Sequence, residues 1–371
     1  MRVLYFTRGY TAHDHRFLAK LAQTGNEIGY LRLLPPSGAD DQHALPDGIQ
    51  RLELRNTSRE IAWWDYPRLV RAVRHALRTF EPQVVHAGPV QDCAFLAAWA
   101  GANPLVTMSW GSDILTAARR GPGRVTARYA LSRTTVFVCD CQAVRQAAVT
   151  LGAPAERVVV FPWGVDLKHF SPGDGSGLRR RLGWEHTFVV LSTRSWEPSY
   201  GMGTLVAGFV RAAAQVPSLR LMILGSGSQG PQLRRLLAQA GMSERVHFAG
   251  SVVLEDLPTY YRAADLYLTA SRSDGSSVSL LEAMACGLPA VVSDIPGNRE
   301  WVSTDVNGWR FMPGRPDALA DSLRAAFAAR ESLPEMGRRA RSIAEARADW
   351  DRNFPRLLGA YRMAAEARGA R

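Results

Sequence analysis

Short runs rich in β-branched residues alternate with helical patterns along almost the whole chain, and this alternation constrains the fold more than any other feature. In the first half, strand-like runs and helical patterns alternate at 2–7, 16–24, 84–87, 92–100, 135–139 and 143–151. The rhythm restarts in the second half at 187–192, 202–215, 220–224, 232–240 and 289–293. Such alternation is typical of parallel sheets covered by helices, so we expect an α/β fold.

A stretch of small and flexible residues separates the two halves. The sequence SPGDGSG at 171–177 has the composition of a linker, and a chain of 371 residues is long enough for two domains. We therefore predict two Rossmann-like domains at 1–170 and 178–349, with 350–371 forming a terminal helix that packs back on the first domain. Domains of this kind would face each other across a cleft at the carboxyl ends of their strands, where ligands of such folds bind.

The chain is strongly basic, with a net charge of +11 and a pI near 10.0. A basic balance can indicate an anionic partner such as nucleic acid, phospholipid or a nucleotide. Lys20 and Lys168 are the only lysines, however, so the charge is almost entirely arginine, which a GC-rich genome also produces. No zinc-finger, homeodomain or ribonucleoprotein motif occurs, so we do not expect nucleic-acid binding.

Neither a membrane span nor a cysteine-based site is expected. No apolar run approaches the roughly 20 residues that a span requires, and the chain opens on a strand-like segment rather than a charged leader, which predicts a cytoplasmic protein. The four cysteines contain no CxxC pair, so reduced thiols are expected rather than disulfides or a zinc site. They are Cys93, Cys139, Cys141 and Cys286.

The stretch 271–300, SRSDGSSVSLLEAMACGLPAVVSDIPGNRE, is the most informative for chemistry. Its DGSS loop at 274–277 precedes a helical pattern that we expect to end at Cys286, with Gly287 just beyond. Small residues at a helix N-terminus let backbone amides approach a phosphate closely. Glu282 follows Asp274 after seven residues, about two helical turns, so one carboxylate can address a donor sugar and the other a ribose. A capped surface helix with Asp274 as its N-terminal acid would explain the same pattern.

This stretch closely resembles the E-x7-E signature of retaining glycosyltransferases of family 4, which have the GT-B fold. The resemblance covers nearly the whole chain. Further matches are RVLYFTRGYTAHDHRFL, PQVVHAGPVQD, TMSWGSDIL, FPWGVDLKHFSP, ILGSGSQG and the last helix with Trp350 and Tyr361.

The resemblance implies that the N-terminal domain holds the acceptor and the C-terminal domain the nucleotide-sugar donor, which would be UDP- or GDP-linked. It implies catalytic roles for Asp274 and Arg194, and a ribose contact for Glu282. The remaining donor-binding residues that it implies are Gly275, Ser276, Ser277, Val278, Tyr200, Gly9, Gly225 and Val253. The acceptor-side residues that it implies are Tyr10, His13, His86, Trp110 and Asp113, although an N-cap role explains Asp113 equally well and exposed turns often carry residues such as His13 for structural reasons.

Three positions depart from the family pattern. Asp274 stands where the family usually has Glu, which shortens the side chain by one methylene and keeps the charge. The family's diphosphate clamp is an Arg followed six positions later by a Lys; Arg194 matches the first, but Tyr200 occupies the second and can donate at most one neutral hydrogen bond. Trp110 replaces a His near the reacting centre, and it can stack on a sugar but cannot relay a proton.

No metal and no cofactor are expected. The only Asp-x-Asp triplet, at 349–351, lies far from the glycine-rich loops, so Arg194 and the helix dipole should stabilise the leaving group. We therefore expect a metal-independent retaining glycosyltransferase that acts on a glycan, lipid-linked or small-molecule acceptor. Two alternatives stay open: a GT-B nucleotide-sugar epimerase, and a binding subunit with weakened catalysis. A pyridoxal-phosphate phosphorylase is poorly supported, since it needs a Schiff-base lysine.

Trp63 and Trp64 precede a helical pattern with a basic face and an apolar face. The basic face carries Arg68, Arg71, Arg74, His75 and Arg78, and the apolar face carries Leu69, Val70, Val73 and Leu77. Aromatic residues beside a basic amphipathic helix are typical of a peripheral membrane contact at the inner face of the membrane. A solvated helix whose apolar face belongs to the core is the competing interpretation.

Overall fold

The computed structural model describes residues 1–36, 44–54 and 60–369, and its contacts divide the chain into two units. The first comprises Met1–Phe161 with Phe354–Arg371, and the second comprises Pro162–Asn353. The flexible-looking stretch at 171–177 lies inside the second unit rather than between the two. The guanidinium of Arg262 donates to the carbonyl (2.9 Å) and hydroxyl (3.1 Å) of Ser171, so tertiary hydrogen bonds hold this stretch in place.

Among the described residues, the first unit contains a seven-stranded parallel sheet in the order β3-β2-β1-β4-β5-β6-β7. The strands are β1 (Arg2–Thr7), β2 (Glu27–Arg32), β3 (Ile49–Leu52), β4 (Val84–Ala87), β5 (Leu105–Met108), β6 (Val136–Cys139) and β7 (Val158–Val160). The middle strands are buried on both faces, which is why they are short apolar runs without alternation.

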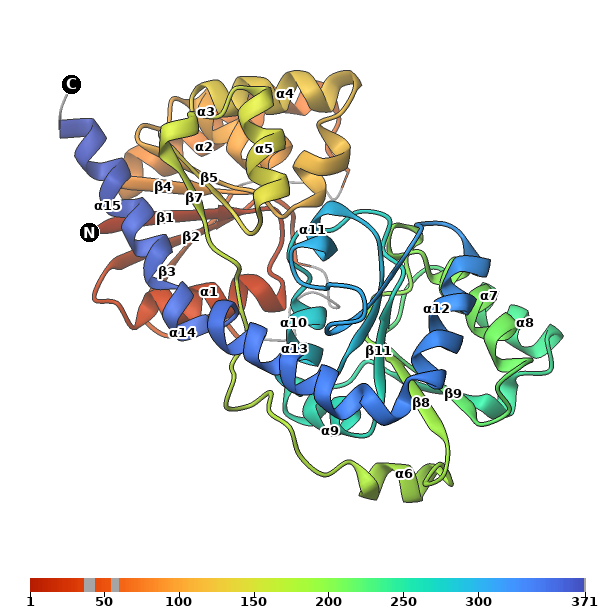
Figure 1. Cartoon of the computed structure of the whole chain (residues 1–371). Coiled ribbons are helices and arrows are strands. Elements are labelled where there is room, and N and C mark those ends of the chain that lie inside the picture. Colours follow the sequence, from red (N-terminus) through yellow and green to blue (C-terminus); the bar gives the residue numbers. More distant parts are fainter. Residues whose placement is uncertain (37–43, 55–59, 370–371) are drawn as a thin grey trace. The chain divides into compact units, whose positions relative to one another are not determined.

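Helices cover both faces of this sheet (Figure 1). They are α1 (Ala12–Ala22), α2 (Tyr66–Phe80), α3 (Phe95–Ala100), α4 (Gly121–Ser132), α5 (Gln142–Leu151) and the C-terminal α15 (Pro355–Gly369), with short helical turns η1 (Trp63–Asp65), η2 (Val90–Ala94), η3 (Asp113–Ala117) and η4 (Ala155–Arg157). Helix α15 contacts β4 to β7. The apolar side chains Leu69, Val70 and Val73 of α2 are buried in the core, so this helix has its apolar face turned inward.

The second unit contains a six-stranded parallel sheet in the order β10-β9-β8-β11-β12-β13 among the residues described. The strands are β8 (Phe188–Ser192), β9 (Leu219–Leu224), β10 (Val246–Gly250), β11 (Leu266–Thr269), β12 (Ala290–Ser293) and β13 (Gly308–Phe311). Two hydrophobic clusters fill its two faces, one under α7, α8 and α12 and the other under α9 and α10, and residues of α13 belong to both.

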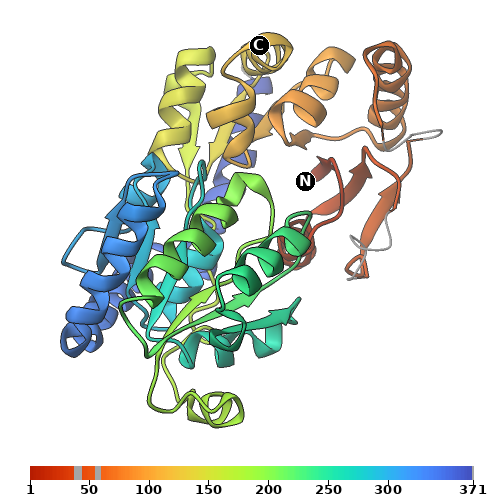
Figure 2. The ribbon, with the colours of Figure 1, turned by 90° about the vertical axis from the view of Figure 1, so that its right-hand side faces the viewer.

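These helices lie on either side of the sheet in both views (Figure 1, Figure 2). The helices of the second unit are α6 (Ser176–Leu182), α7 (Met202–Ala213), α8 (Gly230–Gln239), α9 (Leu257–Arg262), α10 (Val278–Ala285), α11 (Pro296–Arg299), α12 (Pro316–Ala328), α13 (Leu333–Arg347) and α14 (Trp350–Asn353). Short turns are η5 (Pro198–Tyr200), η6 (Ser243–Arg245), η7 (Leu254–Asp256) and η8 (Arg330–Ser332).

Each sheet has a point at which the strand order reverses. In the first unit, β1 lies between β2 and β4, and in the second unit β8 lies between β9 and β11. Crossovers leave in opposite directions there, which opens a crevice at the carboxyl ends of the strands and makes this the usual ligand site of an open α/β sheet. Gly9 follows β1, Arg194 follows β8 and Asp274 follows β11, so candidate residues of both units lie at these points.

Candidate active site

Arg194, two residues after β8, is the centre of a polar cluster in the second unit. Its Nη2 donates to Oδ2 of Asp274 at 2.7 Å, and its Nη1 donates to the hydroxyls of Ser277 (2.7 Å) and Ser279 (3.1 Å). The side chains of Arg194 and Asp274 are only 12% and 18% exposed. Burial raises the pKa of the Asp274 carboxyl, and the charge of Arg194 acts against that rise. The structure thus brings together the first acid and the first cation that the sequence singled out.

Tyr200 contacts the same guanidinium through its ring. The Arg194 Cζ atom lies 4.2 Å from the centre of the Tyr200 ring, which is a cation–π contact. The turn that carries Tyr200 requires glycine at position 201. Gly201 has a φ of +65°, and a Cβ there would lie 2.0 Å from the carbonyl oxygen of Ala270. Tyr200 therefore lies in the predicted cluster and contacts Arg194 through its ring.

Glu282 lies on α10, which begins at Val278 and ends before Cys286 and the left-handed Gly287, as the sequence predicted. Its Oε2 accepts a hydrogen bond from the hydroxyl of Tyr261 at 2.7 Å. Burial, and next the charge of Glu282, raise the pKa of Tyr261 well above its usual value, so this hydroxyl stays protonated and can donate. The bond orients the carboxylate that the resemblance assigns to a ribose.

The other predicted donor-side residues of the second unit lie at or before helix N-termini and in loops after strands. Ser277 is the N-cap residue of α10, and the hydroxyl of Ser276 accepts from the indole of Trp301 at 3.1 Å. Gly225 follows β9 in the left-handed region, and Val253 is 61% exposed before η7. Gly275 lies in the loop between β11 and α10.

The first unit has a cavity of about 480 Å³ where β1, β4 and β5 end. Its lining includes the predicted residues His13, Trp110 and Asp113, and also Gly9. Gly9 therefore lies at this cavity of the first unit, and its contact with the donor stays a prediction. Two single turns of π-helix, η2 and η3, form part of the wall, a conformation that is frequent at functional sites.

The buried Asp113 organises this cavity. Its Oδ1 accepts from the Ser109 hydroxyl (2.6 Å) and from the amides of Trp110 (3.1 Å) and Ile114 (3.0 Å), and its Oδ2 accepts from the amide of Val90 (3.0 Å). Burial raises the pKa of this carboxyl, and these four hydrogen bonds oppose the rise. Asp113 thus joins the loops after β4 and β5. The N-cap residue of η3 is Ser112, so Asp113 does not have the capping role that was the alternative interpretation.

Two predicted acceptor-side residues do not line the cavity. His86 is buried inside the unit, where its Nδ1 lies 2.6 Å from the hydroxyl of Tyr361 on α15, and burial lowers its pKa to about 3. The hydroxyl of Tyr10 is also turned inward and contacts Nδ1 of His15 at 2.8 Å. The expectation that His86 faces a cleft is therefore wrong, because the C-terminal helix returns to cover the strand that carries it.

Asp14 follows His13 at the first turn after β1. It lines the cavity, but its side chain is buried and forms a capping box with Thr11, whose amide and hydroxyl donate to Oδ2 at 2.8 and 2.6 Å. Burial raises the pKa of Asp14 to about 6. Its main role in the structure is to begin α1.

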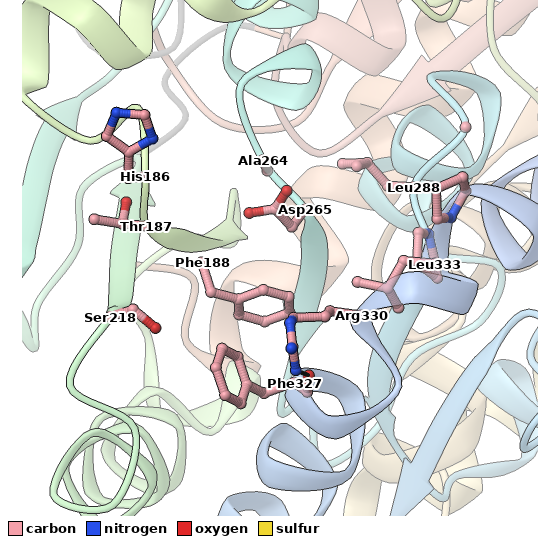
Figure 3. A pocket seen from close by; sticks show the side chains of 13 residues that line it. His186, Thr187, Phe188, Ser218, Ala264, Asp265, Leu288, Phe327, Arg330 and Leu333 are labelled. Atoms are coloured by element: carbon pink, nitrogen blue, oxygen red, sulfur yellow. Dashed lines mark hydrogen bonds between the residues drawn. The ribbon is translucent and has the colours of Figure 1, made fainter.

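The second unit has a cavity of about 500 Å³ at the end of its sheet opposite to Arg194 (Figure 3). Phe188 and Asp265 of its wall stand at the amino ends of β8 and β11. Its acid is already paired, since Asp265 accepts from Arg179 at 2.7 Å and from the amide of Val189 at 2.7 Å. Ligands of parallel sheets bind at the carboxyl ends, so this cavity is not the candidate site.

Sequence reasoning missed several residues of the site. Ser279 lies within the informative stretch, three residues before Glu282, and its helical spacing could have indicated it. Tyr261 has no such signal, because it comes from α9 and meets Glu282 only through tertiary packing. Arg8, Gln91 and Asp92 also line the first unit's cavity. Within the described part of the chain, no group of three His, Cys, Asp or Glu residues is placed to hold a metal ion.

Solved structures share this architecture. HepE of Anabaena, solved with UDP, superposes with a TM-score of 0.79 at 22% identity over 97% of this chain and 99% of its own. Sucrose-phosphate synthase of Thermosynechococcus elongatus superposes with a TM-score of 0.83 at 20% identity over 99% of this chain and 100% of its own. The two Rossmann-like units thus define the GT-B fold class, as expected.

Family models identify the chain more closely. The model described as "Glycosyl transferases group 1" matches residues 178–343, and the model described as "Glycosyltransferase Family 4" matches residues 8–169. The chain belongs to glycosyltransferase family 4, which confirms the resemblance.

Individual relatives are more distant. A D-inositol 3-phosphate glycosyltransferase of Geodermatophilus obscurus is 34% identical over 61% of this chain and 52% of its own length. A GDP-mannose-dependent alpha-(1-6)-phosphatidylinositol monomannoside mannosyltransferase of Mycobacterium tuberculosis is 27% identical over 71% of each chain. The chain spans about half the length of the inositol-phosphate relatives that it matches.

Proposed function

We propose that the protein is a retaining glycosyltransferase that transfers a sugar from a nucleoside-diphosphate donor to a hydroxyl group of an acceptor. The observation that carries the proposal is the cluster of Arg194, Asp274 and Ser277 at the point where strand order reverses in the second unit, with Glu282 on the same helix as the serine. A fixed cation, a helix N-terminus and a ribose-directed acid are the groups that a nucleotide sugar requires.

In this proposal the second unit binds the donor and the first binds the acceptor. Glu282 accepts from a ribose hydroxyl, and Arg194 with the N-terminus of α10 faces the diphosphate. HepE was solved with UDP and the mycobacterial relative uses GDP-mannose by name, so UDP- and GDP-linked sugars are the first donors to test. Relatives named for inositol phosphate and for a mannoside leave the acceptor open between a small molecule, a glycan and a lipid-linked sugar.

The proposed reaction needs no protein nucleophile. The acceptor oxygen forms a bond to the anomeric carbon on the face from which the diphosphate departs, the bond from that carbon to the diphosphate oxygen breaks, and the departing oxygen takes the acceptor proton. Arg194 stabilises the negative charge that develops on the diphosphate. We further propose that this stabilisation is independent of a metal ion, because Arg194 and helix α10 supply it.

The test is the anomeric configuration of the first product. Incubation of the purified chain with a UDP- or GDP-sugar and a set of acceptors, followed by proton NMR at early times, should show transfer with the configuration of the donor retained. An inverted product would refute the retaining mechanism. Incubation with the nucleotide sugar alone separates the alternatives: an epimerase converts the sugar without an acceptor, whereas a chain that neither hydrolyses nor transfers the sugar fits a binding subunit.

We also propose that the first unit contacts the inner, cytoplasmic face of a membrane. Trp63 and Trp64 support this proposal, since they are 78% and 66% exposed. They precede α2, whose outer face carries the exposed Arg68 and Arg71. None of the described helices has the length and apolar character that crossing a membrane requires. The apolar face of α2 is buried, so the tryptophans and arginines would make the contact.

Co-sedimentation with vesicles tests this contact. Vesicles that contain phosphatidylglycerol should retain the protein more strongly than pure phosphatidylcholine vesicles, and the double variant Trp63→Ala/Trp64→Ala should lose most of the binding. Trp99→Ala is the matched control, since Trp99 is a 41% exposed tryptophan of the same unit on α3. Equal binding of the double variant and the control variant would refute the proposal.

A further inference from the structure

The cavity of the first unit combines an aromatic surface with an excess of carboxylates. Among the described residues of its wall, Asp14, Asp92 and Asp113 stand against Arg8 as the one guanidinium. Arg8 donates to Oδ2 of Asp92 at 3.0 Å, so its charge is partly compensated before any ligand binds. This balance disfavours an anion at the cavity, since each added negative charge meets carboxylates at short range.

Trp110 provides the aromatic surface, and its position is defined from three sides. Its amide donates to Asp113 at 3.1 Å, and the imidazole of His13 lies 6.3 Å from its ring, tilted by 38°. Gly88 provides room for the indole, because a Cβ at that position would lie 3.2 Å from Nε1 of Trp110 and 2.4 Å from the carbonyl oxygen of Met108. An indole held in this way can stack on the apolar face of a sugar ring.

The remaining polar groups of the wall suit hydroxyl groups. Thr7, Gln91, Ser112 and Thr116 are neutral donors and acceptors, and the partly exposed carboxylate of Asp92 can accept a hydrogen bond from a sugar hydroxyl. The volume of about 480 Å³ is within the range of small-ligand sites.

We infer that this cavity binds an acceptor carbohydrate ring that bears no phosphate, with the ring stacked on Trp110. The inference rests on the proposed glycosyltransferase function and specifies its acceptor class. Asp113 acts here as a positioning residue, since it holds the Trp110 amide. Trp110 stands where the family has a His near the reacting centre, and it orients the acceptor ring but transfers no proton.

The test uses saturation-transfer NMR on the full chain with neutral rings and their phosphorylated counterparts. The probes are methyl α-D-glucopyranoside, methyl α-D-mannopyranoside and myo-inositol, each compared with a monophosphate of the same ring, in the presence of excess UDP or GDP. We expect saturation transfer to at least one neutral ring, and binding of its phosphorylated counterpart that is weaker by about tenfold or more. Absence of transfer to every neutral ring, or stronger binding of the phosphorylated form, would overturn the inference.

Variants separate a stacking role from a merely structural one. Trp110→Phe should retain most of the neutral-ring binding, whereas Trp110→Ala should weaken it by about tenfold while the melting temperature of the chain with UDP or GDP stays near that of the wild type. Trp99→Ala, outside the cavity, should bind as the wild type does. Asp92→Asn removes one of the three acids, so the affinity for a phosphorylated ring should come closer to the affinity for the neutral ring. An unchanged ratio of these two affinities would contradict the charge argument.

Failure of this inference can be distinguished from failure of the proposed function. Nucleoside diphosphate binding depends on the second unit and is read from the rise in melting temperature. A chain that binds UDP or GDP but prefers a phosphorylated ring keeps the proposed function and loses this inference. A chain that binds neither nucleotide loses the proposed function itself.

Discussion

The ring of Tyr200 is the feature of the donor site whose replacement gives the clearest test. Its centre lies 4.2 Å from Cζ of Arg194, and the arginine side chain is 12% exposed. A cation–π contact of this kind is worth about 1–2 kcal/mol when the cation is largely desolvated. The stack, together with Asp274, holds the guanidinium in one orientation, and loss of the ring would let Arg194 sample others before a diphosphate binds.

We therefore expect Tyr200→Leu to weaken diphosphate binding by about fivefold to thirtyfold, which corresponds to that energy. Tyr200→Phe keeps the ring and removes only the hydroxyl, so it is the matched control and should change the affinity by less than about threefold. Tyr200→Lys places a second cation beside Arg194, so we expect a lower melting temperature without ligand and a larger rise on adding diphosphate.

Calorimetric titration with UDP and GDP measures these affinities, and melting temperatures show whether each variant is folded. A folded Tyr200→Leu variant with wild-type affinity would refute the stacking role. Equal losses of diphosphate affinity in Tyr200→Phe and Tyr200→Leu would also refute the stacking role, because they would show that the hydroxyl, bonded to a phosphate, contributes the affinity.

Four further predictions concern other parts of the chain. Glu282→Ala should lower diphosphate affinity by about tenfold to a hundredfold, since a charge-assisted bond to ribose is worth about 1.5–3 kcal/mol; unchanged titration curves for a folded variant would remove the ribose role. Transferase activity should survive a chelator, and its loss with recovery on adding magnesium or manganese would disprove metal independence. Burial lowers the pKa of His86 to about 3, so below pH 6.5 the unfolded chain binds more protons than the folded chain, and the free energy of unfolding falls as the pH falls. Between pH 7 and pH 5 the wild type should lose about 2 kcal/mol more of this free energy, measured by urea unfolding, than His86→Asn does, and equal losses would contradict this. Asp113→Asn replaces one carboxylate oxygen by an NH2 group, which would face hydrogen-bond donors instead of accepting from them, so the melting temperature of the first unit should fall. An unchanged melting temperature would show that the loops after β4 and β5 do not depend on this carboxylate.

Local patterns predicted the α/β class and the donor helix well. The strand runs at 2–7 and 84–87 coincide with β1 and β4, because a buried parallel strand is a short continuous apolar segment wherever it occurs. Helix α10 ends where Gly287 adopts the left-handed conformation that glycine favours. The two helical turns expected between Asp274 and Glu282 are not formed, because Asp274 lies in the loop before α10 and the helix begins only at Val278.

The linker at 171–177 shows where composition is insufficient. Its small residues predict flexibility, yet Arg262 holds Ser171 through two hydrogen bonds, and the division between the units falls at 161/162. Composition describes what a free segment would do, whereas the contacts that hold it come from α9, some 90 residues later in the chain.

The sequence by itself determined the class of fold and the parallel sheets, because these follow from short-range periodicity, and it indicated the acids and the arginine of the donor site through the family resemblance. Only the tertiary structure decided what each side chain meets. His86 is enclosed by Tyr361, which lies 275 residues away, and the Tyr200 ring stacks on Arg194. Such contacts depend on which elements pack together, and burial then determines whether a polar residue can face a ligand or must bond inside the protein.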